Sequence, residues 1–249
     1  MGKLQDKVAL VTGSGRNIGR ATVLKLAAEG CNVVVNARSN QAEADAVADE
    51  ARSLGVKALP ILADVSSKEQ VDTMINMAMS EFGRIDILIN NAAVRPHKPF
   101  TELSLQDWEA VRGVVLDGAY YATRAVIESM VDHNFGRIIF FTGEGAFRGS
   151  ATRAHVSAAK MGLVGLARGL ASEFAGNNIR VIVVSPGSID TSRANPEWYA
   201  NSPPSASGVP MGRQGHPDEI AATCLFLVSD DGGYITGQTI HVNGGDGYY

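Results

Sequence analysis

The fold of this chain is indicated by residues 8–19, VALVTGSGRNIG, in which a short apolar run is followed by glycines and then by a helical pattern. The glycines are Gly13, Gly15 and Gly19, a spacing that differs from strict GxGxxG. Glycines at a strand-to-helix turn let the backbone approach a pyrophosphate, which the positive end of the helix then stabilises. Because this turn follows the first strand of an alternating chain, it predicts a dinucleotide site.

Beyond this stretch, short β-branched runs alternate with longer segments of helical period. The runs are continuously apolar, as is typical of parallel strands covered by helices on both faces. The strand candidates are Val8–Thr12, Asn32–Asn36, Val56–Ala63, Ile85–Asn90, Arg137–Thr142, Arg180–Ser185 and Gln238–Val242, and the helix candidates are 18–29, 41–54, 67–82, 104–132, 152–175 and 217–229. This order predicts an α/β fold, a single-domain Rossmann-like doubly wound sheet of seven mainly parallel strands flanked by helices.

Composition narrows the classes of function. The chain has 249 residues, 45% of them hydrophobic, which suits one domain spanning 1–249. Its net charge of −4 offers no basic field for nucleic acid, and no apolar run is long enough for a signal segment or a membrane span. Cys31 and Cys224 lie in separate apolar runs without CxxC spacing, so we expect no disulfide, no metal site and a cytoplasmic location.

One segment interrupts the alternation of strands and helices. Six of the nine prolines fall between Pro186 and Pro217, among Asn, Ser and Gly residues. A loop that leaves the carboxyl end of a strand in an open α/β sheet overhangs the ligand crevice. We therefore predict a substrate lid at about 188–216, although a surface excursion without function is the alternative.

The residues after the second strand bear on the cofactor. A dinucleotide site commonly has an acid about 20 residues after the glycines, which binds the ribose 2′-hydroxyl. This chain has Arg38 there instead, and Arg16 lies in the glycine loop. A guanidinium suits a 2′-phosphate by charge and bidentate geometry, which predicts NADP(H) as the cofactor. The alternative is that Arg38 is a solvated turn residue.

Further motifs along the chain carry a resemblance to a known family. Over essentially all 249 residues the sequence resembles the short-chain dehydrogenase/reductases, and especially their ketoacyl-carrier-protein-reductase-like branch. The motifs that match are Thr12-Gly13 through Gly19, Asp64-Val65, Asn90-Asn91-Ala92-Ala93, Lys160, Pro186-Gly187-Ser188-Ile189-Asp190-Thr191, Thr236-Gly237-Gln238 and Gly244-Gly245. In the glycine loop, Asn17 replaces the middle glycine of the family pattern and is a mild departure, because Asn tolerates turn conformations.

The resemblance implies how a cofactor is held. Asp64 and Val65 would hold the adenine, and Asn90 and Ala92 would line the cofactor cleft. Ile189 and Thr191 would hold the nicotinamide carboxamide, and Lys160 would hold the nicotinamide ribose. The other cofactor contacts that the resemblance implies come from the glycine loop, with Arg16, Asn17 and Ile18, and from the turn at Pro186 and Gly187.

The catalytic residues of the family do not carry over. Members usually have an Asn, a Ser, a Tyr that acts as acid and base, and a Lys four residues after that Tyr. Only Lys160 is retained, because the other three positions hold Val115, Gly143 and Val156. Since valine and glycine side chains have no proton to exchange, any catalysis requires other groups.

Two other titratable residues lie close to these positions. Glu144 follows Gly143 at the carboxyl end of a strand, where a partly apolar cleft can raise a carboxyl pKa; it could equally pair with Arg148 or Arg153. His155 titrates near neutral pH, but within a helix it lies about 140° around the axis from Lys160. We therefore take Lys160, Glu144 and His155 as the catalytic candidates.

The surroundings of the expected cleft suggest its substrate. Basic groups at Arg95, His97, Arg148 and Arg153 would suit an acidic substrate, whereas the lid side chains Trp198, Tyr199 and Met211 would suit an apolar one. The alternative for the basic groups is that they form a solvated rim. The alternative for the apolar side chains is that they close the lid over the core.

These patterns predict an NADP(H)-dependent oxidoreductase that acts on a small carbonyl or alcohol with a non-standard acid/base. Two alternatives stay open. One is a non-redox lyase, isomerase or hydrolase on the same scaffold, and the other is a catalytically inactive NADP(H)-binding regulatory protein. The resemblance also implies a homotetramer with the helices at 104–132 and 152–175 at one interface.

Overall fold

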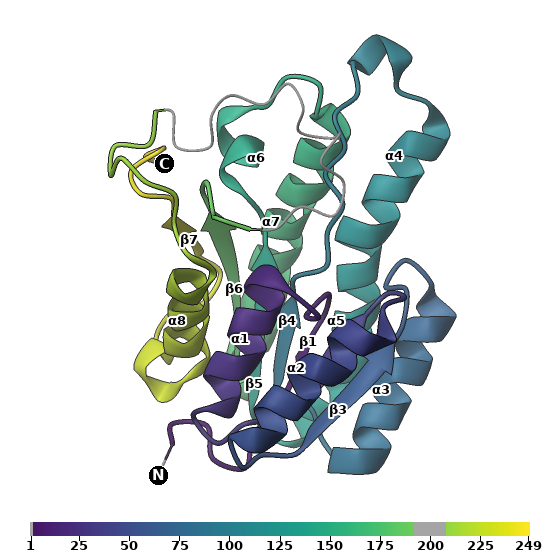
Figure 1. The fold of residues 1–249 in the computed structure, drawn as a ribbon, viewed down its shortest axis with the longest axis vertical. Helices are drawn as coiled ribbons and strands as arrows, with labels where there is room; N and C mark the ends of the chain where they lie inside the picture. Colours follow the sequence, from purple (N-terminus) through teal and green to yellow (C-terminus); the bar gives the residue numbers. More distant parts are fainter. Residues whose placement is uncertain (1, 192–207) are drawn as a thin grey trace.

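A parallel sheet separates two layers of helices in the computed structural model, which describes residues 2–191 and 208–249 (Figure 1). The strand order is β3-β2-β1-β4-β5-β6-β7, and every neighbouring pair is parallel. The strands are β1 (Val8–Val11), β2 (Asn32–Ala37), β3 (Ala58–Leu62), β4 (Ile87–Asn90), β5 (Gly136–Phe141), β6 (Ile179–Pro186) and β7 (Thr239–Val242). All seven predicted strands are present, and the predicted fold class is confirmed.

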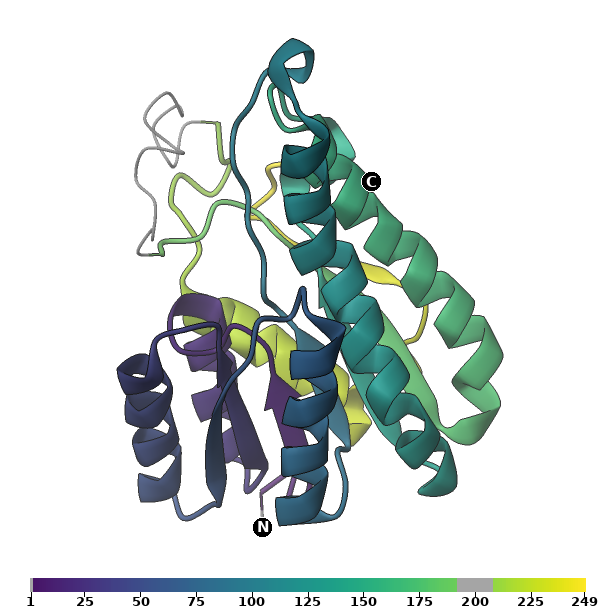
Figure 2. The ribbon, with the colours of Figure 1, turned by 90° about the vertical axis from the view of Figure 1, so that its right-hand side faces the viewer.

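Helices cover both faces of the sheet. One face is packed by α1 (Asn17–Ala27), α2 (Gln41–Ser53) and α8 (Pro217–Val228), and the other by α3 (Lys68–Phe82), α5 (Gly118–Asp132) and α7 (Ala154–Phe174). In Figure 2, α4 (Leu105–Arg112) continues towards α5 beside α7. Within the described residues, no helix is both long and apolar enough to cross a membrane.

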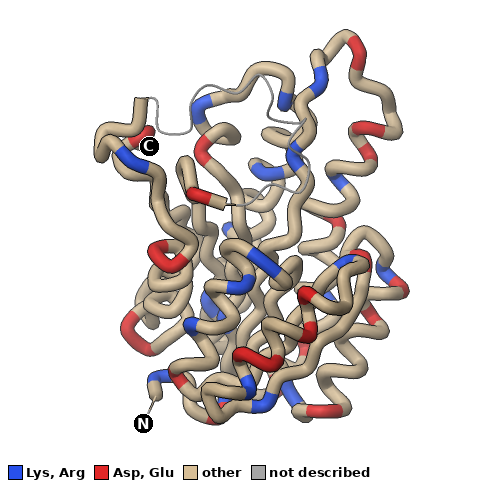
Figure 3. Tube along the Cα trace, viewed as in Figure 1, with Lys and Arg blue, Asp and Glu red and all other residues tan. Residues whose placement is uncertain are grey.

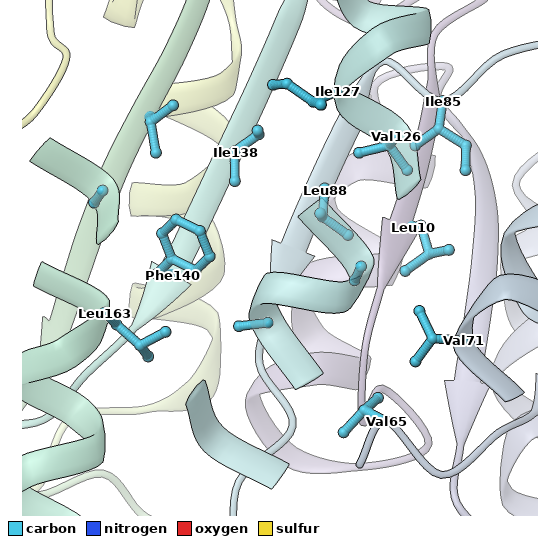
Figure 4. Close-up of a cluster of buried hydrophobic side chains, with 14 of the residues drawn as sticks. Leu10, Val65, Val71, Ile85, Leu88, Val126, Ile127, Ile138, Phe140 and Leu163 are labelled. Atoms are coloured by element: carbon cyan, nitrogen blue, oxygen red, sulfur yellow. The ribbon is translucent and has the colours of Figure 1, made fainter. Parts of the chain in front are cut away.

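The central strands show why their sequences are continuously apolar. On β5, Ile138 and Phe140 point into the core beneath α5 and α7, whereas Ile139 and Phe141 point into the core beneath α1 and α8. Figure 4 shows the first of these cores, with Phe140 drawn between Ile138 and Leu163. Each buried side chain of this size contributes about 1.5–3 kcal/mol, so both faces of the sheet stabilise the fold.

The helix expected at 104–132 is divided into two. A π-helix, Gly113–Asp117, separates α4 from α5. A Cβ on Gly118, the first residue of α5, would lie 2.7 Å from the carbonyl oxygen of Val65. This close approach of helix and loop needs a glycine. Single π-turns inside α-helices are frequent at functional sites.

The segment expected as one helix at 152–175 also differs. A short helix, α6 (Glu144–Arg148), precedes α7, and α7 begins at Ala154. The five residues of α6 have no helical period in the sequence, because glycines lie within and directly after them at Gly145 and Gly149.

Both cysteines are buried and unpaired. Cys31 and Cys224 have no exposed surface, and burial raises the pKa of each thiol, that of Cys224 to about 12. The described part of the chain contains no group of three His, Cys, Asp or Glu side chains arranged to hold a metal ion.

Candidate active site

The glycine loop lies at the carboxyl end of the sheet, where the order of strands reverses between β1 and β4. Ligands of open α/β sheets bind at such a switch point. Gly13 has a φ of +61°, and a Cβ there would lie 3.0 Å from Ala92 Cα. A Cβ on Gly19 would lie 2.6 Å from the carbonyl oxygen of Gly13. Both positions therefore require glycine.

The start of α1 is open to an anion. Arg16 is the N-cap residue, its side chain makes no capping hydrogen bond, and the first turn has no acidic residue. Asn17 has a φ of +52°, in the left-handed region that asparagine tolerates, which explains how it occupies a glycine position. Gly15 and Ile18 complete the turn, and a Cβ on Gly15 would lie 3.2 Å from Glu43 Cβ.

A buried polar network holds this loop in place. Asn36 accepts a hydrogen bond from Gly13 N at 3.1 Å and donates one to Ala63 O at 3.1 Å. Thr12 Oγ1 accepts bonds from Asn91 N at 3.0 Å and from Ala92 N at 3.1 Å. Sequence reasoning missed these supporting roles. The available signal was a polar residue, Asn36, at the end of an apolar strand.

The residues expected at the adenosine end lie along the same edge of the sheet. Arg16 and Arg38 are both exposed, and neither guanidinium forms an ion pair or hydrogen bond within residues 2–191 and 208–249. Asp64 Oδ1 accepts hydrogen bonds from Ser66 N at 2.9 Å and Ser66 Oγ at 2.7 Å. Val65 is 6% exposed and belongs to the core. Two free guanidinium groups here suit a phosphorylated ribose.

A narrow hollow without room for a water molecule lies at the switch point. Its lining contains two residues predicted for the cofactor cleft, Asn90 and Ala92, and the full set is Thr12, Val65, Asn90, Ala92, Val114, Gly118 and Ala119. Asn90 is buried, and its Nδ2 lies 3.5 Å from Thr123 Oγ1.

The turn after β6 forms the next part of the site. Gly187 N donates to Val242 O at 3.0 Å, and a Cβ on Gly187 would lie 2.7 Å from Asn243 Cα. Ile189 bridges to Gly215 in a parallel arrangement. Pro186 ends β6, and Thr191, inside the lid predicted at about 188–216, is the last residue described before position 192. Residues 192–207, with Trp198 and Tyr199, lie outside the described residues.

The positions that the resemblance assigns to catalysis come together at the end of β5. Val115 lies in the π-helix, Val156 lies in α7, and both are buried in the same apolar core. Gly143 follows β5 with an extended φ of 172°, and the nearest neighbour of a Cβ there is Pro186 O at 3.9 Å. The space for a side chain is therefore present at Gly143.

Lys160 is the titratable residue beside these three positions. Its side chain is buried in α7, and its Nζ donates to Phe141 O at 2.5 Å. Burial, and then the charge of Arg95, lower the pKa of Lys160 to about 7. Both protonation states of this amine are consequently accessible near neutral pH.

Glu144 contacts residues near the C-terminus and does not pair with Arg148 or Arg153. Its Oε2 accepts a hydrogen bond from Asn243 Nδ2 at 3.0 Å and lies 3.4 Å from His241 Nδ1. It is buried, and the phenol of Tyr249 lies beside it; partial burial and this carboxylate raise the pKa of Tyr249. The alternative pairing of Glu144 with Arg148 is not found, and Arg148 pairs with Asp246 at 2.7 Å. The sequence did not predict that the partners of Glu144 lie among the last residues of the chain.

His155 lies on α7, because that helix begins one residue before it. His155 is 2% exposed, and neither of its ring nitrogens has a hydrogen-bond partner among the residues that the structure describes. Burial is the main cause that lowers the pKa of His155. The charges of Arg153 and Lys98 also lower this pKa, whereas the charge of Asp107 raises it. His155 therefore faces the α4 side of the helix, which favours Lys160 over His155 as the group at the reacting position.

The residues present fit a nicotinamide dinucleotide. A glycine loop without room for side chains meets an uncapped helix start, free guanidinium groups lie at one end, and a buried lysine lies at the other. Bound there, the phosphates would face the start of α1 and the nicotinamide would face the Pro186–Thr191 turn.

Comparison with known proteins identifies the family. Residues 13–246 match the family model described as enoyl-(acyl carrier protein) reductase. A 3-oxoacyl-(acyl-carrier-protein) reductase of Synechocystis is 39% identical over 98% of both chains. The chain belongs to the short-chain dehydrogenase/reductase family. A solved variant of the Serratia marcescens short-chain dehydrogenase/reductase has a TM-score of 0.91 at 33% identity, covering 98% of this chain and 99% of that one.

A further relative in the family acts on a different substrate. A subunit of (2S)-((R)-hydroxy(phenyl)methyl)succinyl-CoA dehydrogenase from Thauera aromatica is 38% identical over 97% of both chains. With relatives of this kind along its whole length, the chain is an oxidoreductase of the short-chain dehydrogenase/reductase family, as the sequence predicted.

Proposed function

We propose that this short-chain dehydrogenase/reductase is an NADP(H)-dependent enzyme that interconverts a carbonyl and an alcohol with Lys160 as its acid/base. The observation that carries this proposal is the buried Lys160 ammonium, whose pKa lies at about 7, beside three positions without a proton to exchange. An acid/base is most effective when its pKa lies near the working pH.

The charge at the adenosine end supports NADP(H) over NAD(H). Arg16 and Arg38 are exposed on adjoining segments, and no acid takes the place that a ribose 2′-hydroxyl would need. A guanidinium binds a phosphate through paired charge-assisted hydrogen bonds.

The role of each residue follows from its position. When bound, the nicotinamide supplies or accepts the hydride. Lys160 Nζ, oriented by Phe141 O, would donate a hydrogen bond to the carbonyl oxygen and transfer the proton. Because Lys160 is buried, its ammonium acts in a low dielectric.

The names of the relatives support an acyl substrate with an oxo or hydroxyl group. The Synechocystis relative is a reductase of a 3-oxoacyl group, and the Thauera relative is a dehydrogenase of a hydroxylated succinyl-CoA. We place the protein in the cytoplasm, because two buried and unpaired cysteines suit a reducing compartment.

The pH dependence of carbonyl reduction tests Lys160. With NADPH saturating, we expect the rate to fall as the pH rises through about 7, because the ammonium that donates the proton is lost. Lys160→Arg keeps the charge but cannot titrate, so it should lower the rate at least a hundredfold and remove this dependence. A Lys160→Arg enzyme with the wild-type profile would contradict the role of Lys160.

The cofactor assignment is tested by binding. Fluorescence titration should show at least a tenfold weaker affinity of Arg38→Gln for NADPH, with the affinity for NADH unchanged. The matched control is Arg20→Gln, because Arg20 lies on α1 and is paired with Glu50. Failure of the wild-type protein to bind NADPH would refute the proposed function.

A second candidate is an NADP(H)-binding protein without turnover. It is favoured by Val115, Gly143 and Val156, which replace the proton relay with groups that cannot exchange protons. Tight NADPH binding combined with no oxidation of NADPH across a panel of oxo acids, oxo esters and oxoacyl thioesters would select it over the first candidate.

A further inference from the structure

Glu144 is a buried carboxylate that faces the end of the chain. Its Oε2 accepts a hydrogen bond from Asn243 Nδ2 at 3.0 Å and lies 3.4 Å from His241 Nδ1. Glu144 is 5% exposed, and a Cβ on Gly247 would collide with its Oε1. The carboxylate is therefore enclosed by β7 and by the residues that follow it, 243–249, which we call the C-terminal segment. Figure 1 shows α6 and the C-terminus at the same end of the molecule.

Two further contacts tie α6 to the C-terminal segment. Arg148, the last residue of α6, pairs with Asp246 at 2.7 Å. The rings of Phe147, His241 and Tyr249 form a cluster, with centroids 4.7, 5.1 and 5.5 Å apart. Figure 3 shows an acidic segment beside the marked C-terminus. The C-terminal segment is therefore held along the length of α6, from its first residue to its last.

The C-terminal segment also supports the turn that follows β6. Gly187 N donates to Val242 O at 3.0 Å, and a Cβ on Gly187 would lie 2.7 Å from Asn243 Cα. The Oδ1 of Asn243 accepts a hydrogen bond from Gly245 N at 3.0 Å, which shapes the start of the segment. Asn243 thus contacts Gly187 through its backbone and Glu144 through its side chain.

Glu144 and Asn243 lie on either side of β6. In the sheet, β6 is placed between β5 and β7. Glu144 follows the end of β5 by three residues, and Asn243 follows β7 directly. Their hydrogen bond therefore spans the carboxyl end of β6, where the chain continues into the Pro186–Thr191 turn.

We propose that Glu144 is a positioning residue, which fixes the Pro186–Thr191 turn for the nicotinamide by holding Asn243 across the end of β6. This inference rests on the proposed function, and it gives Glu144 a role other than that of an acid/base. A turn that is fixed before the cofactor binds reduces the cost of ordering it on binding. The loss of a hydrogen bond to a charged group can change an affinity by about tenfold or more.

The test compares two ligands that share the adenosine end. NADPH and adenosine 2′,5′-bisphosphate, which lacks the nicotinamide, are titrated by calorimetry into the wild type and into variants. Glu144→Leu removes the acceptor for Asn243, so it should weaken NADPH binding by about tenfold and leave the affinity for the bisphosphate unchanged. Glu144→Gln keeps an acceptor oxygen and should bind both ligands as the wild type does. The matched control is Glu81→Leu, because Glu81 is exposed in the last turn of α3.

A second pair of variants tests the hydrogen bond itself. Asn243→Asp replaces the donor with a second carboxylate oxygen beside Glu144, so it should also weaken NADPH binding by about tenfold. The double variant Asn243→Asp with Glu144→Gln exchanges donor and acceptor, and it should bind NADPH about threefold more tightly than Asn243→Asp alone. The recovery should be partial, because Asn243 Nδ2 also donates to Gly247 O at 2.9 Å.

The outcomes separate the two proposals. An unchanged NADPH affinity in Glu144→Leu, an equal loss for both ligands, or a double variant no better than Asn243→Asp would overturn the positioning role. If Glu144→Leu does not fold, the comparison of Asn243→Asp with the double variant decides alone. Failure of the wild-type protein to bind NADPH would instead overturn the proposed function, and the same titration reports it.

Discussion

The catalytic positions differ from the family pattern in their side chains, and at Gly143 the backbone leaves room for a Cβ. Gly143 is extended and has space for a Cβ, the π-helix persists around Val115, and Lys160 keeps its place on α7. The sequence predicted which side chains are missing, because the motif spacing around Lys160 is intact. It could not predict the room for a Cβ at Gly143, since this depends on the distance to Pro186 O, which is far away in the sequence.

Restoring two hydroxyls should therefore increase activity. The double variant Gly143→Ser with Val156→Tyr is expected to raise kcat for NADPH-dependent reduction of an oxo substrate by at least tenfold, because a phenol beside the Lys160 charge is an effective proton donor. The control variant, Gly143→Ala with Val156→Phe, has similar volume and no hydroxyl. An equal gain in both variants would show that packing, rather than proton transfer, is responsible.

The buried Lys160 also makes stability depend on pH. Its folded-state pKa of about 7 lies below the ordinary 10.5, so the unfolded chain binds the proton more tightly and stability is lost as the pH falls towards 7. Between pH 10 and pH 7 this costs about 4 kcal/mol. Lys160→Met should lack this contribution, and urea unfolding at both pH values measures it. A constant difference between the wild type and Lys160→Met would contradict the lowered pKa.

At the scale of elements, hydrophobic patterning was sufficient to predict the strands. It was insufficient to predict where helices are interrupted. Every strand was predicted, and even Pro60 fits because β3 is an edge strand. The division of residues 104–132 by the π-helix was missed. Directly after it, Gly118 packs closely against Val65, a contact between residues far apart in the sequence. Glu144 was placed correctly at a strand end, but its partners lie about a hundred residues away on β7 and beyond.

Because α5 packs closely against the Asp64–Val65 loop, we expect alanine substitutions at two nearby glycines to differ in their effect on stability. A Cβ on Gly118 would lie 2.7 Å from Val65 O, whereas one on Gly113 would lie 3.5 Å from Ser66 Cβ, an ordinary contact. Gly118→Ala should lower the free energy of unfolding by about 1–3 kcal/mol. Gly113→Ala should leave it unchanged or raise it by up to about 1 kcal/mol through helix propensity. Equal effects in urea unfolding would refute the close contact.

At the scale of the whole molecule, the exposed apolar side chains favour self-association through α5 and α7. Tyr120 on α5 and Met161 on α7 are 48% and 40% exposed. We predict a homotetramer that uses these helices. Light scattering should give about four times the chain mass of 26.3 kDa for the wild type and a smaller mass for Met161→Glu. The control is Met77→Glu, similarly exposed on α3 and expected to remain tetrameric.

The two buried cysteines have a practical consequence for labelling. Neither Cys31 nor Cys224 exposes its sulfur, and their raised pKa values keep both as protonated thiols. A maleimide reacts with accessible thiolates, so the folded chain should remain unlabelled. A cysteine introduced at an exposed position, for example in place of Phe100, would then carry a fluorophore at one defined place without removal of the native cysteines.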